Sequence, residues 1–341
     1  MSSSKTSTLA QAIFTPINRH LARPRLWRTG AAAAAVWLAA GLLTLHWPDQ
    51  QIGFVQWGYA QELGLGLIAL GLLIALAALP FNTVLALRKR IETLGPWLLA
   101  LGLFIAVWEV LTAKLPVLPA PFFAPPQSLI EVYSSDWQRL ADSLFNSLWL
   151  LLNGVLIGSV SGFLTGVAIG WSSALGYWVH PILRFLGPVP STALLPMAFF
   201  FFPSGWAAAV FLIALATWFP VTVLTWSGVA GVDKALYDVA RTMGARPSFL
   251  ILRVAIPAAL PHVFVGLFMG LGASFSVLVA AEMMGVKSGL GWYLSWAQGW
   301  ASYANMYAAL IVMALVFSGL ITLLFLVRDR LLAWQKGVVK W

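Results

Sequence analysis

Residues 206–230 read WAAAVFLIALATWFPVTVLTWSGVA and contain no charged side chain. A helix needs about 20 consecutive apolar residues to cross the hydrocarbon core of a bilayer, and this stretch is long enough. The rest of the 341-residue chain follows the same pattern, because 60% of its residues are hydrophobic and only 9% are charged. A water-soluble fold cannot bury so much apolar surface, so the sequence predicts an integral membrane protein.

Further apolar stretches of similar length bring the prediction to eight membrane-spanning helices and an all-α fold. The predicted spans are 30–47, 63–87, 95–113, 143–170, 182–202, 206–230, 257–283 and 305–327. The first is the shortest. The fifth contains Pro188, Pro190 and Pro196, which disfavour a continuous helix.

The distribution of basic residues supports an even number of spans with both termini in the cytoplasm. In that topology all of the 20 Lys and Arg residues lie on the cytoplasmic side except Lys114, Arg139 and Lys287. Removing one span would reverse every later loop and abolish this asymmetry. The formal charge of +9 is therefore interpreted as a signal of membrane orientation, and no nucleic-acid partner is expected.

The N-terminal part begins with a basic leader followed by the first apolar run. A cleavable signal peptide is the alternative interpretation, but the leader is long for one and no small-x-small cleavage site precedes Trp47. We expect an uncleaved span, and we interpret the first two spans as an addition to a six-span core. The predicted parts are the leader 1–29, the two added spans 30–90, the core 91–335 and the tail 336–341.

The fourth predicted span carries glycines at strict four-residue spacing: Gly154, Gly158, Gly162, Gly166 and Gly170. Successive glycines share one helix face, where a neighbouring backbone can approach closely. We favour tight packing within one subunit over a conduit-lining face. A similar small-residue face is formed in the seventh span by Gly266, Gly270 and Ser274.

The longest cytoplasmic loop between spans covers residues 231–256 and reads GVDKALYDVARTMGARPSFLILRVAI. Apolar residues at helical spacing from Leu236 to Met243 predict an amphipathic helix. Gly244 ends this helix, and Pro247 suits the first turn of a second short one. Periodicity alone leaves two interpretations open, namely a helix that rests on lipid headgroups or a docking lever for a cytoplasmic partner.

Within this loop, Asp238-Val239-Ala240 is followed at fixed spacing by Gly244 and then by Val254-x-Ile256-Pro257. This run resembles the EAA loop of permease subunits of ATP-binding-cassette (ABC) importers, Glu-Ala-Ala-x3-Gly-x9-Ile-x-Leu-Pro. Asp238 and Val239 depart from that pattern. Other short motifs resemble the sulfonate, nitrate and taurine branch: LGPVPSTALLPM at 186–197, PAALP at 257–261, AEM at 281–283 and SGLG at 288–291. The resemblance covers about 95–335.

The resemblance implies a type I ABC importer core in the bacterial inner membrane. Its implied partners are two cytoplasmic ATP-binding subunits, a second copy of the permease that completes a homodimer, and a periplasmic or lipid-anchored solute-binding protein. The cargo would be a small anion such as a sulfonate, taurine or nitrate. The loop 233–257 would couple to the ATPase through Asp238, Val239, Ala240, Arg241, Gly244, Ala245, Arg246 and Pro247.

The chain has no Gly-x4-Gly-Lys-Ser/Thr loop to hold phosphates, so ATP and Mg²⁺ are expected on the partner subunit and no cofactor on this chain. We expect a transport subunit, not an enzyme. With four His and no Cys, no metal site is predicted either.

Small hydroxyls beside proline- or glycine-weakened helix are candidates for the path of an anion: Ser191, Thr192, Ser274 and Ser276. Bonds to their own helix backbone are the alternative for each. Glu282 lies deep in a core span, and we interpret it either as a helix cap or hydrated surface residue, or as a gate contact or a partner for a cation. Glu109 is expected at the membrane rim.

Three other classes of protein remain as alternatives. A secondary transporter would carry membrane-embedded acids on several helices, and apart from Glu282 the spans have almost none. A membrane enzyme would need clustered catalytic His, Asp or Glu. A receptor-like protein would not require a glycine-hinged cytoplasmic loop.

Overall fold

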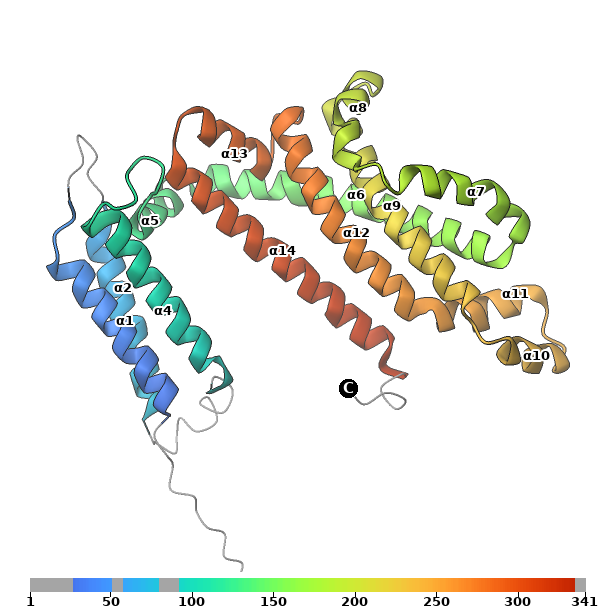
Figure 1. The fold of residues 1–341 in the computed structure, drawn as a ribbon, viewed down its shortest axis with the longest axis horizontal. Helices are drawn as coiled ribbons and strands as arrows, with labels where there is room; N and C mark the ends of the chain where they lie inside the picture. The colour runs from blue at the N-terminus through green and yellow to red at the C-terminus, as the bar shows by residue number, and fades with distance from the viewer. Residues whose placement is uncertain (1–26, 51–57, 80–91, 335–341) are drawn as a thin grey trace, which may run out of the picture. The chain divides into compact units, whose positions relative to one another are not determined.

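The computed structural model describes residues 27–50, 58–79 and 92–334, and every regular element within them is a helix (Figure 1). The chain divides into two compact units. The first comprises residues up to 120 together with 125–130, and the second comprises 121–124 and the chain from 131 onward. Most of the predicted leader, the basic run Arg88-Lys89-Arg90 and the predicted tail lie outside the described residues.

The first unit contains three long helices. They are α1 (Arg28–His46), α2 (Ala60–Ala78) and α4 (Gly95–Glu109); a 3-10 turn, η2 (Glu92–Leu94), precedes α4 and a π-helical turn, η3 (Val110–Lys114), extends it. Helix α1 packs against both α2 and α4. Gly102 on α4 leaves room for the indole of Trp37, which donates a hydrogen bond to the Leu98 carbonyl at 2.8 Å. These contacts mean that α1, α2 and α4 form a defined bundle.

The second unit is built around α9, which lies between α6 and α12 (Figure 1). Its elements are α5 (Pro126–Ser135), whose first half belongs to the first unit, α6 (Trp137–Trp171), α7 (Ser173–Leu186), η4 (Ser191–Leu194), α8 (Leu195–Phe201), α9 (Gly205–Ala230), α10 (Lys234–Thr242), α11 (Pro247–Phe249), the π-turn η5 (Leu250–Ala255), α12 (Ile256–Met284), α13 (Leu290–Gly299) and α14 (Tyr303–Leu331).

The glycines of α6 form a continuous seam with α9. At Gly158, an added Cβ would lie 2.4 Å from the Ala214 carbonyl oxygen, and at Gly162 it would lie 2.8 Å from that of Trp218. The same clash recurs one helical turn further along at Gly166, against α9. The prediction that this face packs within the subunit is therefore confirmed.

The small-residue face of α12 packs on α9 as well. Gly266 and Gly270 lie against the backbone of α9 at Val221 and Thr217. Ser274 continues the row and forms a hydroxyl–hydroxyl hydrogen bond with Thr217. Helix α9 is thus contacted closely along two faces, which accounts for its many fully buried residues.

Most of the predicted spans correspond to long apolar helices. Seven helices among the described residues have the length and hydropathy to cross a membrane, and a bent helix pair raises the number to eight if it counts as one span. The continuous helix predicted over 182–202 is wrong. Helix α7 ends at Leu186, η4 begins at Ser191, and the two segments meet at 86°. Pro188 and Pro190 in the connection lack the amide hydrogens that a continuous helix requires.

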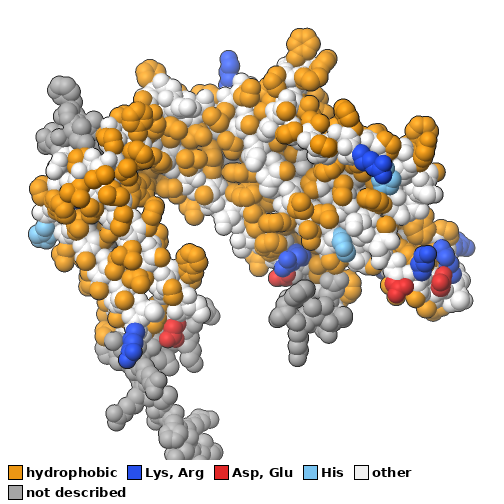
Figure 2. Space-filling model, in the orientation of Figure 1, with side chains coloured by type: hydrophobic (Ala, Val, Ile, Leu, Met, Phe, Trp, Pro, Cys, Tyr) orange, Lys and Arg blue, Asp and Glu red, His pale blue; other side chains and the backbone are white. Residues whose placement is uncertain are grey.

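The surface of both units is strongly apolar. Figure 2 shows hydrophobic side chains over most helices, while basic and acidic side chains gather over α10 and α11. Helix α14 exposes large apolar residues along its length, for example Leu315 and Leu326 at 68% and 63% exposure. A surface of this kind matches a bilayer environment, in which apolar residues face lipid.

The α6–α9 seam leads to a first prediction. We expect Gly158→Ala to lower the stability of the purified protein by about 1–3 kcal/mol, because the new methyl group collides with the α9 backbone. Gly272→Ala is the matched control, since an added Cβ at Gly272 meets no atom within 4 Å. Thermal unfolding in detergent would measure both. Equal melting temperatures for the two variants would contradict the seam.

Candidate functional site

The predicted amphipathic loop folds as a helix, a glycine bend and a second helical segment. Asp233 caps α10 by accepting a hydrogen bond from the Ala235 amide at 2.9 Å. Tyr237 anchors the inner side of the helix, where its ring meets Trp171 edge-on. Partial burial raises the pKa of Tyr237, and the nearby Arg241 opposes this shift. The sequence prediction for this segment is confirmed.

The apolar side of α10 faces away from the rest of the chain. Leu236, Val239 and Met243 are 52%, 61% and 84% exposed. Asp238 and Arg241 are also exposed and form an ion pair at 3.5 Å. A helix that buried its apolar face against its own fold would show the opposite pattern, so this face remains free to enter a membrane surface or a partner's groove.

The bend after α10 depends on Gly244. Its φ is +80°, a backbone conformation that side-chain-bearing residues rarely adopt. Ala245 donates its amide to the Ala240 carbonyl at 3.0 Å, and Arg246 precedes α11, which Pro247 begins. From Pro247 the helical chain continues without a break through η5 and α12 to Met284. The bend therefore connects α10 directly to a long core helix.

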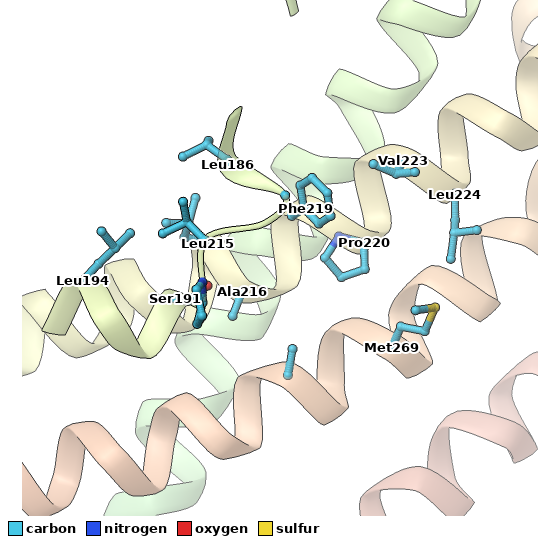
Figure 3. Close-up of a pocket in the computed structure, with 14 residues that line it drawn as sticks. Leu186, Ser191, Leu194, Leu215, Ala216, Phe219, Pro220, Val223, Leu224 and Met269 are labelled. Carbon is cyan, nitrogen blue, oxygen red and sulfur yellow. The ribbon is translucent and has the colours of Figure 1, made fainter. Parts of the chain in front are cut away.

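A cavity of about 420 Å³ lies beside the break between α7 and η4 (Figure 3). Its walls come from this break, from α9 and from α12. The lining is almost wholly apolar and includes Leu194, Leu215, Phe219 and Met269, with Ser191 as a hydroxyl-bearing exception. No charged side chain lines it.

The α9 wall of the cavity carries a weakened stretch of helix. Pro220 stands inside α9 and has no amide hydrogen, so the carbonyl of Ala216 lacks its usual donor four residues later. Both residues line the cavity. The α9 helix is therefore missing one backbone hydrogen bond beside the cavity.

The structure separates the predicted path residues. Ser191 lines the cavity, and its neighbour Thr192 is partly buried outside the lining. Ser276 is exposed on α12. Ser274 is fully buried in the α9–α12 contact, and its hydroxyl also donates to the Gly270 carbonyl at 2.7 Å. The four hydroxyl residues that the sequence analysis grouped as one candidate path therefore do not line one common surface.

Glu282 is 1% exposed and joins three helices. Its carboxylate accepts hydrogen bonds from the Ser147 hydroxyl on α6 and from the Gly291 amide at the start of α13, each at 2.7 Å. Ser147 in turn accepts from the Leu290 amide at 2.7 Å. Gly289 has a φ of +102°, and a Cβ there would collide with the Glu282 carboxylate. Glu282 thus caps α13, which matches the capping alternative drawn from the sequence.

A second polar cluster was not identified from the sequence. The hydroxyl of Tyr293, which is fully buried, donates to Asp136 at 2.7 Å, and Asn305 donates to both residues. Burial raises the pKa of Tyr293, and Asp136 raises it further. Arg139 pairs with Asp136 at 3.7 Å and stacks on Trp296. These residues are far apart in sequence, and the only sequence signal was a lone acid, Asp136, directly before α6.

Similarity to known proteins is extensive. Residues 154–336 match the family described as binding-protein-dependent transport system inner membrane component. An aliphatic sulfonates transport permease protein of Bacillus subtilis is 30% identical over 73% of this chain and 91% of its own length. The taurine transport system permease protein of Escherichia coli is 30% identical over 71% and 87%, and the nitrate import permease protein of Synechococcus elongatus 28% identical over 74% and 92%.

The Glu282 cap leads to a second prediction. We expect Glu282→Ala to destabilise the protein by about 1–3 kcal/mol, because the buried Gly291 amide and Ser147 hydroxyl lose their acceptor. Thermal unfolding would measure the loss, with Glu131→Ala, which removes an exposed acid on α5, as control. An unchanged melting temperature combined with altered transport would instead favour a gate contact.

Proposed function

Because the chain belongs to the family of binding-protein-dependent transport system inner membrane components, we propose that it forms the translocation path of an ABC importer for a small anion. A separate cytoplasmic ATPase supplies the energy. The observation that carries this proposal is the free apolar face of α10, joined through a glycine bend to the longest helical segment of the core.

The coupling site consists of α10 and the bend that follows it. Leu236, Val239 and Met243 provide an exposed apolar ridge at helical spacing, which suits insertion into a groove on a partner. Exposed charges on Asp238 and Arg241 flank this ridge. By resemblance to the EAA pattern, the proposed contact also includes the residues beside this ridge and after the bend: Ala240, Ala245, Arg246 and Pro247, together with Val239 of the ridge. In the competing interpretation, the same apolar face of α10 rests on lipid headgroups. The ATPase co-purification assay described below distinguishes docking to the ATPase from contact with lipid.

Mechanical work enters the core through the continuous segment from Pro247 to Met284. Closure of the ATPase pair on ATP and Mg²⁺ moves the docked α10 elements. The attached helices then alternate between inward- and outward-open arrangements. Gly244 fixes the angle between α10 and this segment, so the transmitted motion depends on it.

The cavity at the α7–η4 break is the proposed wall of the path. Ser191 gives it an isolated hydroxyl, while Thr192 and Ser276 lie near it in sequence on η4 and α12. The absence of charge from its lining suits passage, because an anion that met a fixed cation would be held. Ser274 and Glu282 are better accounted for by the hydrogen bonds that they make between helices.

The complete importer is proposed to contain a homodimer of this chain, two ATPase subunits and a periplasmic or lipid-anchored solute-binding protein in the bacterial inner membrane. Relatives named for aliphatic sulfonates, taurine and nitrate support a small oxyanion as cargo. The core would comprise residues 91–335, with the spans of 30–90 as an addition.

A third prediction tests the coupling site. A β-branched residue at a φ of +80° costs about 1–3 kcal/mol, so Gly244→Val distorts the bend. We expect roughly tenfold less ATPase to co-purify with this variant. Gly299→Val at the end of α13, where an added Cβ meets no atom within 4 Å, is the control. Undiminished ATPase binding and substrate-stimulated ATP turnover would refute the assignment.

A fourth prediction tests the path. Ala273 on α12 lines the cavity at the α7–η4 break, and Ala273→Trp places a large side chain in it. We expect this variant to lose solute uptake while the ATPase still co-purifies with it. Leu315→Trp on the exposed side of α14 should leave uptake unchanged. Radiolabelled uptake into vesicles with the whole importer would measure both. Transport by the purified chain without any ATPase would favour a secondary transporter instead.

A further inference from the structure

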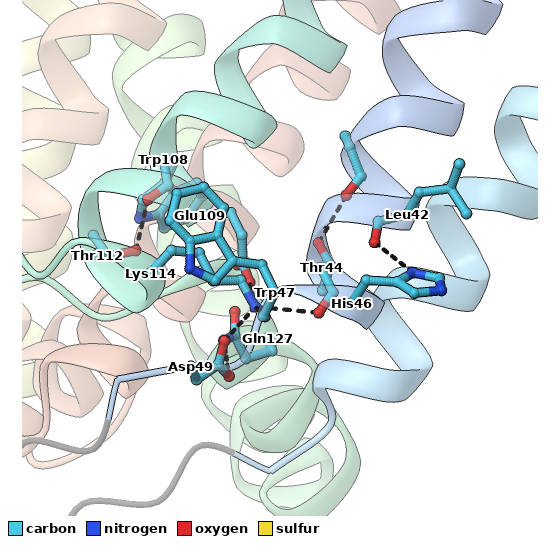
Figure 4. Close-up of polar contacts among 11 residues, drawn as sticks. Leu42, Thr44, His46, Trp47, Asp49, Trp108, Glu109, Thr112, Lys114 and Gln127 are labelled. Carbon is cyan, nitrogen blue, oxygen red and sulfur yellow. Dashed lines mark hydrogen bonds and ion pairs between the residues drawn. The ribbon is translucent and has the colours of Figure 1, made fainter.

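The first unit contains a buried polar node at the end of α1, formed by Asp49, Glu109, Lys114 and Gln127 (Figure 4). Lys114 and Glu109 are each 1% exposed and Gln127 is fully buried. The expectation that Glu109 lies at the membrane rim said nothing of this burial among polar side chains. Neither the coupling site nor the cavity uses these residues.

Lys114 donates all three of its hydrogen bonds to the end of α1 and to the segment that follows it. Its ammonium donates to the Thr44 carbonyl at 3.1 Å, to the Trp47 carbonyl and to Asp49. The Thr44 carbonyl is available because the residue four positions later is Pro48, which has no amide hydrogen. An ammonium has three hydrogens, so none remains for Glu109.

Glu109 and Gln127 are left with unpaired acceptors. The Lys114 nitrogen is 3.6 Å from Glu109, beyond hydrogen-bond distance. Both carboxylate oxygens of Glu109 and the Gln127 amide oxygen are buried without a hydrogen-bond partner among the described residues. The Gln127 amide nitrogen is directed at Asp49, at 3.2 Å. Buried acceptors of this kind normally have a partner.

The charges of the node do not balance. The charged groups that face Glu109 are Lys114 on η3 and Asp49 after α1, and the polar group from α5 is Gln127. Two carboxylates and one ammonium leave one negative charge uncompensated in a buried position, which is unfavourable. A depression lined by Asp49, Lys114, Thr44 and Gln61 lies beside the node. One small cation would both balance the charge and satisfy the free oxygens.

We propose that this node is a binding site for one monovalent cation, held by Glu109 and Gln127 as either a proton or a sodium ion. Carboxylate and amide oxygens suit a hard cation. Because Lys114 and Asp49 join the end of α1 to η3, the bound cation stabilises the packing of the added spans on α4. The site is independent of the proposed transport function.

Thermal unfolding of the full-length chain in lipid nanodiscs tests the proposal. One series raises the pH from about 6 to about 9 in choline chloride, and a second adds sodium chloride at the high pH and constant ionic strength. A proton bound in the folded state is lost as pH rises, so the melting temperature should fall by about 2–4 °C. Reversal of that fall by sodium, but not by choline, identifies sodium; a fall that sodium leaves unchanged identifies a proton.

Glu109→Gln removes the charge that requires the cation, so its melting temperature should lose this response. Glu62→Gln, which alters an exposed acid at the start of α2, should keep it. No response in the wild-type protein, or the same response in Glu109→Gln, overturns the proposal. Should Glu109→Gln fail to fold, labelling the wild-type protein with dicyclohexylcarbodiimide decides. Modification of Glu109 that declines with pH or sodium supports the site, and absence of modification under all conditions overturns it.

Discussion

The close contact of α9 with α6 and α12 is the constraint on which the second unit depends. Within a bilayer, apolar side chains gain little by leaving lipid for another helix, so association relies on close packing. Glycines on α6 and α12 allow that packing along two faces of α9. The two seams fix the position of α9. They therefore also fix where Pro220 lies, where the cavity beside it lies, and how Thr217 meets Ser274 in a hydrogen bond.

Sequence patterns predicted the features that depend on local composition or spacing. Hydropathy identified the long helices, the glycine spacing on α6 identified a packing face, and residues 231–256 were correctly predicted as helix, bend and helix. A continuous helix over the fifth span was wrong, because hydropathy does not detect a change of direction within an apolar segment. Of the three prolines in 182–202, Pro188 and Pro190 lie in the connection where the chain bends by 86°.

Polar residues were harder to interpret, because their roles depend on partners far away in sequence. Glu109 was expected at the membrane rim and Lys114 outside the cytoplasmic side, but neither expectation indicated that both are buried together around the end of α1. Glu282 could be recognised as an unusual acid within a span, but its role could not be assigned, because its partner Ser147 lies on another helix. Only the glycines of the SGLG motif gave a hint, because they permit the α13 backbone to approach the carboxylate.

The unbroken helical run from Pro247 to Met284 comprises 38 residues, which corresponds to roughly 57 Å of helix. α10 is attached at one end, the Glu282 cap of α13 lies at the other, and the tight contact with α9 at Gly266 and Gly270 lies between them. A rod held near its middle turns about that point. Displacement of its α10 end in one direction would therefore carry the α13 end in the opposite direction. The movements of the two ends of the helix are then coupled.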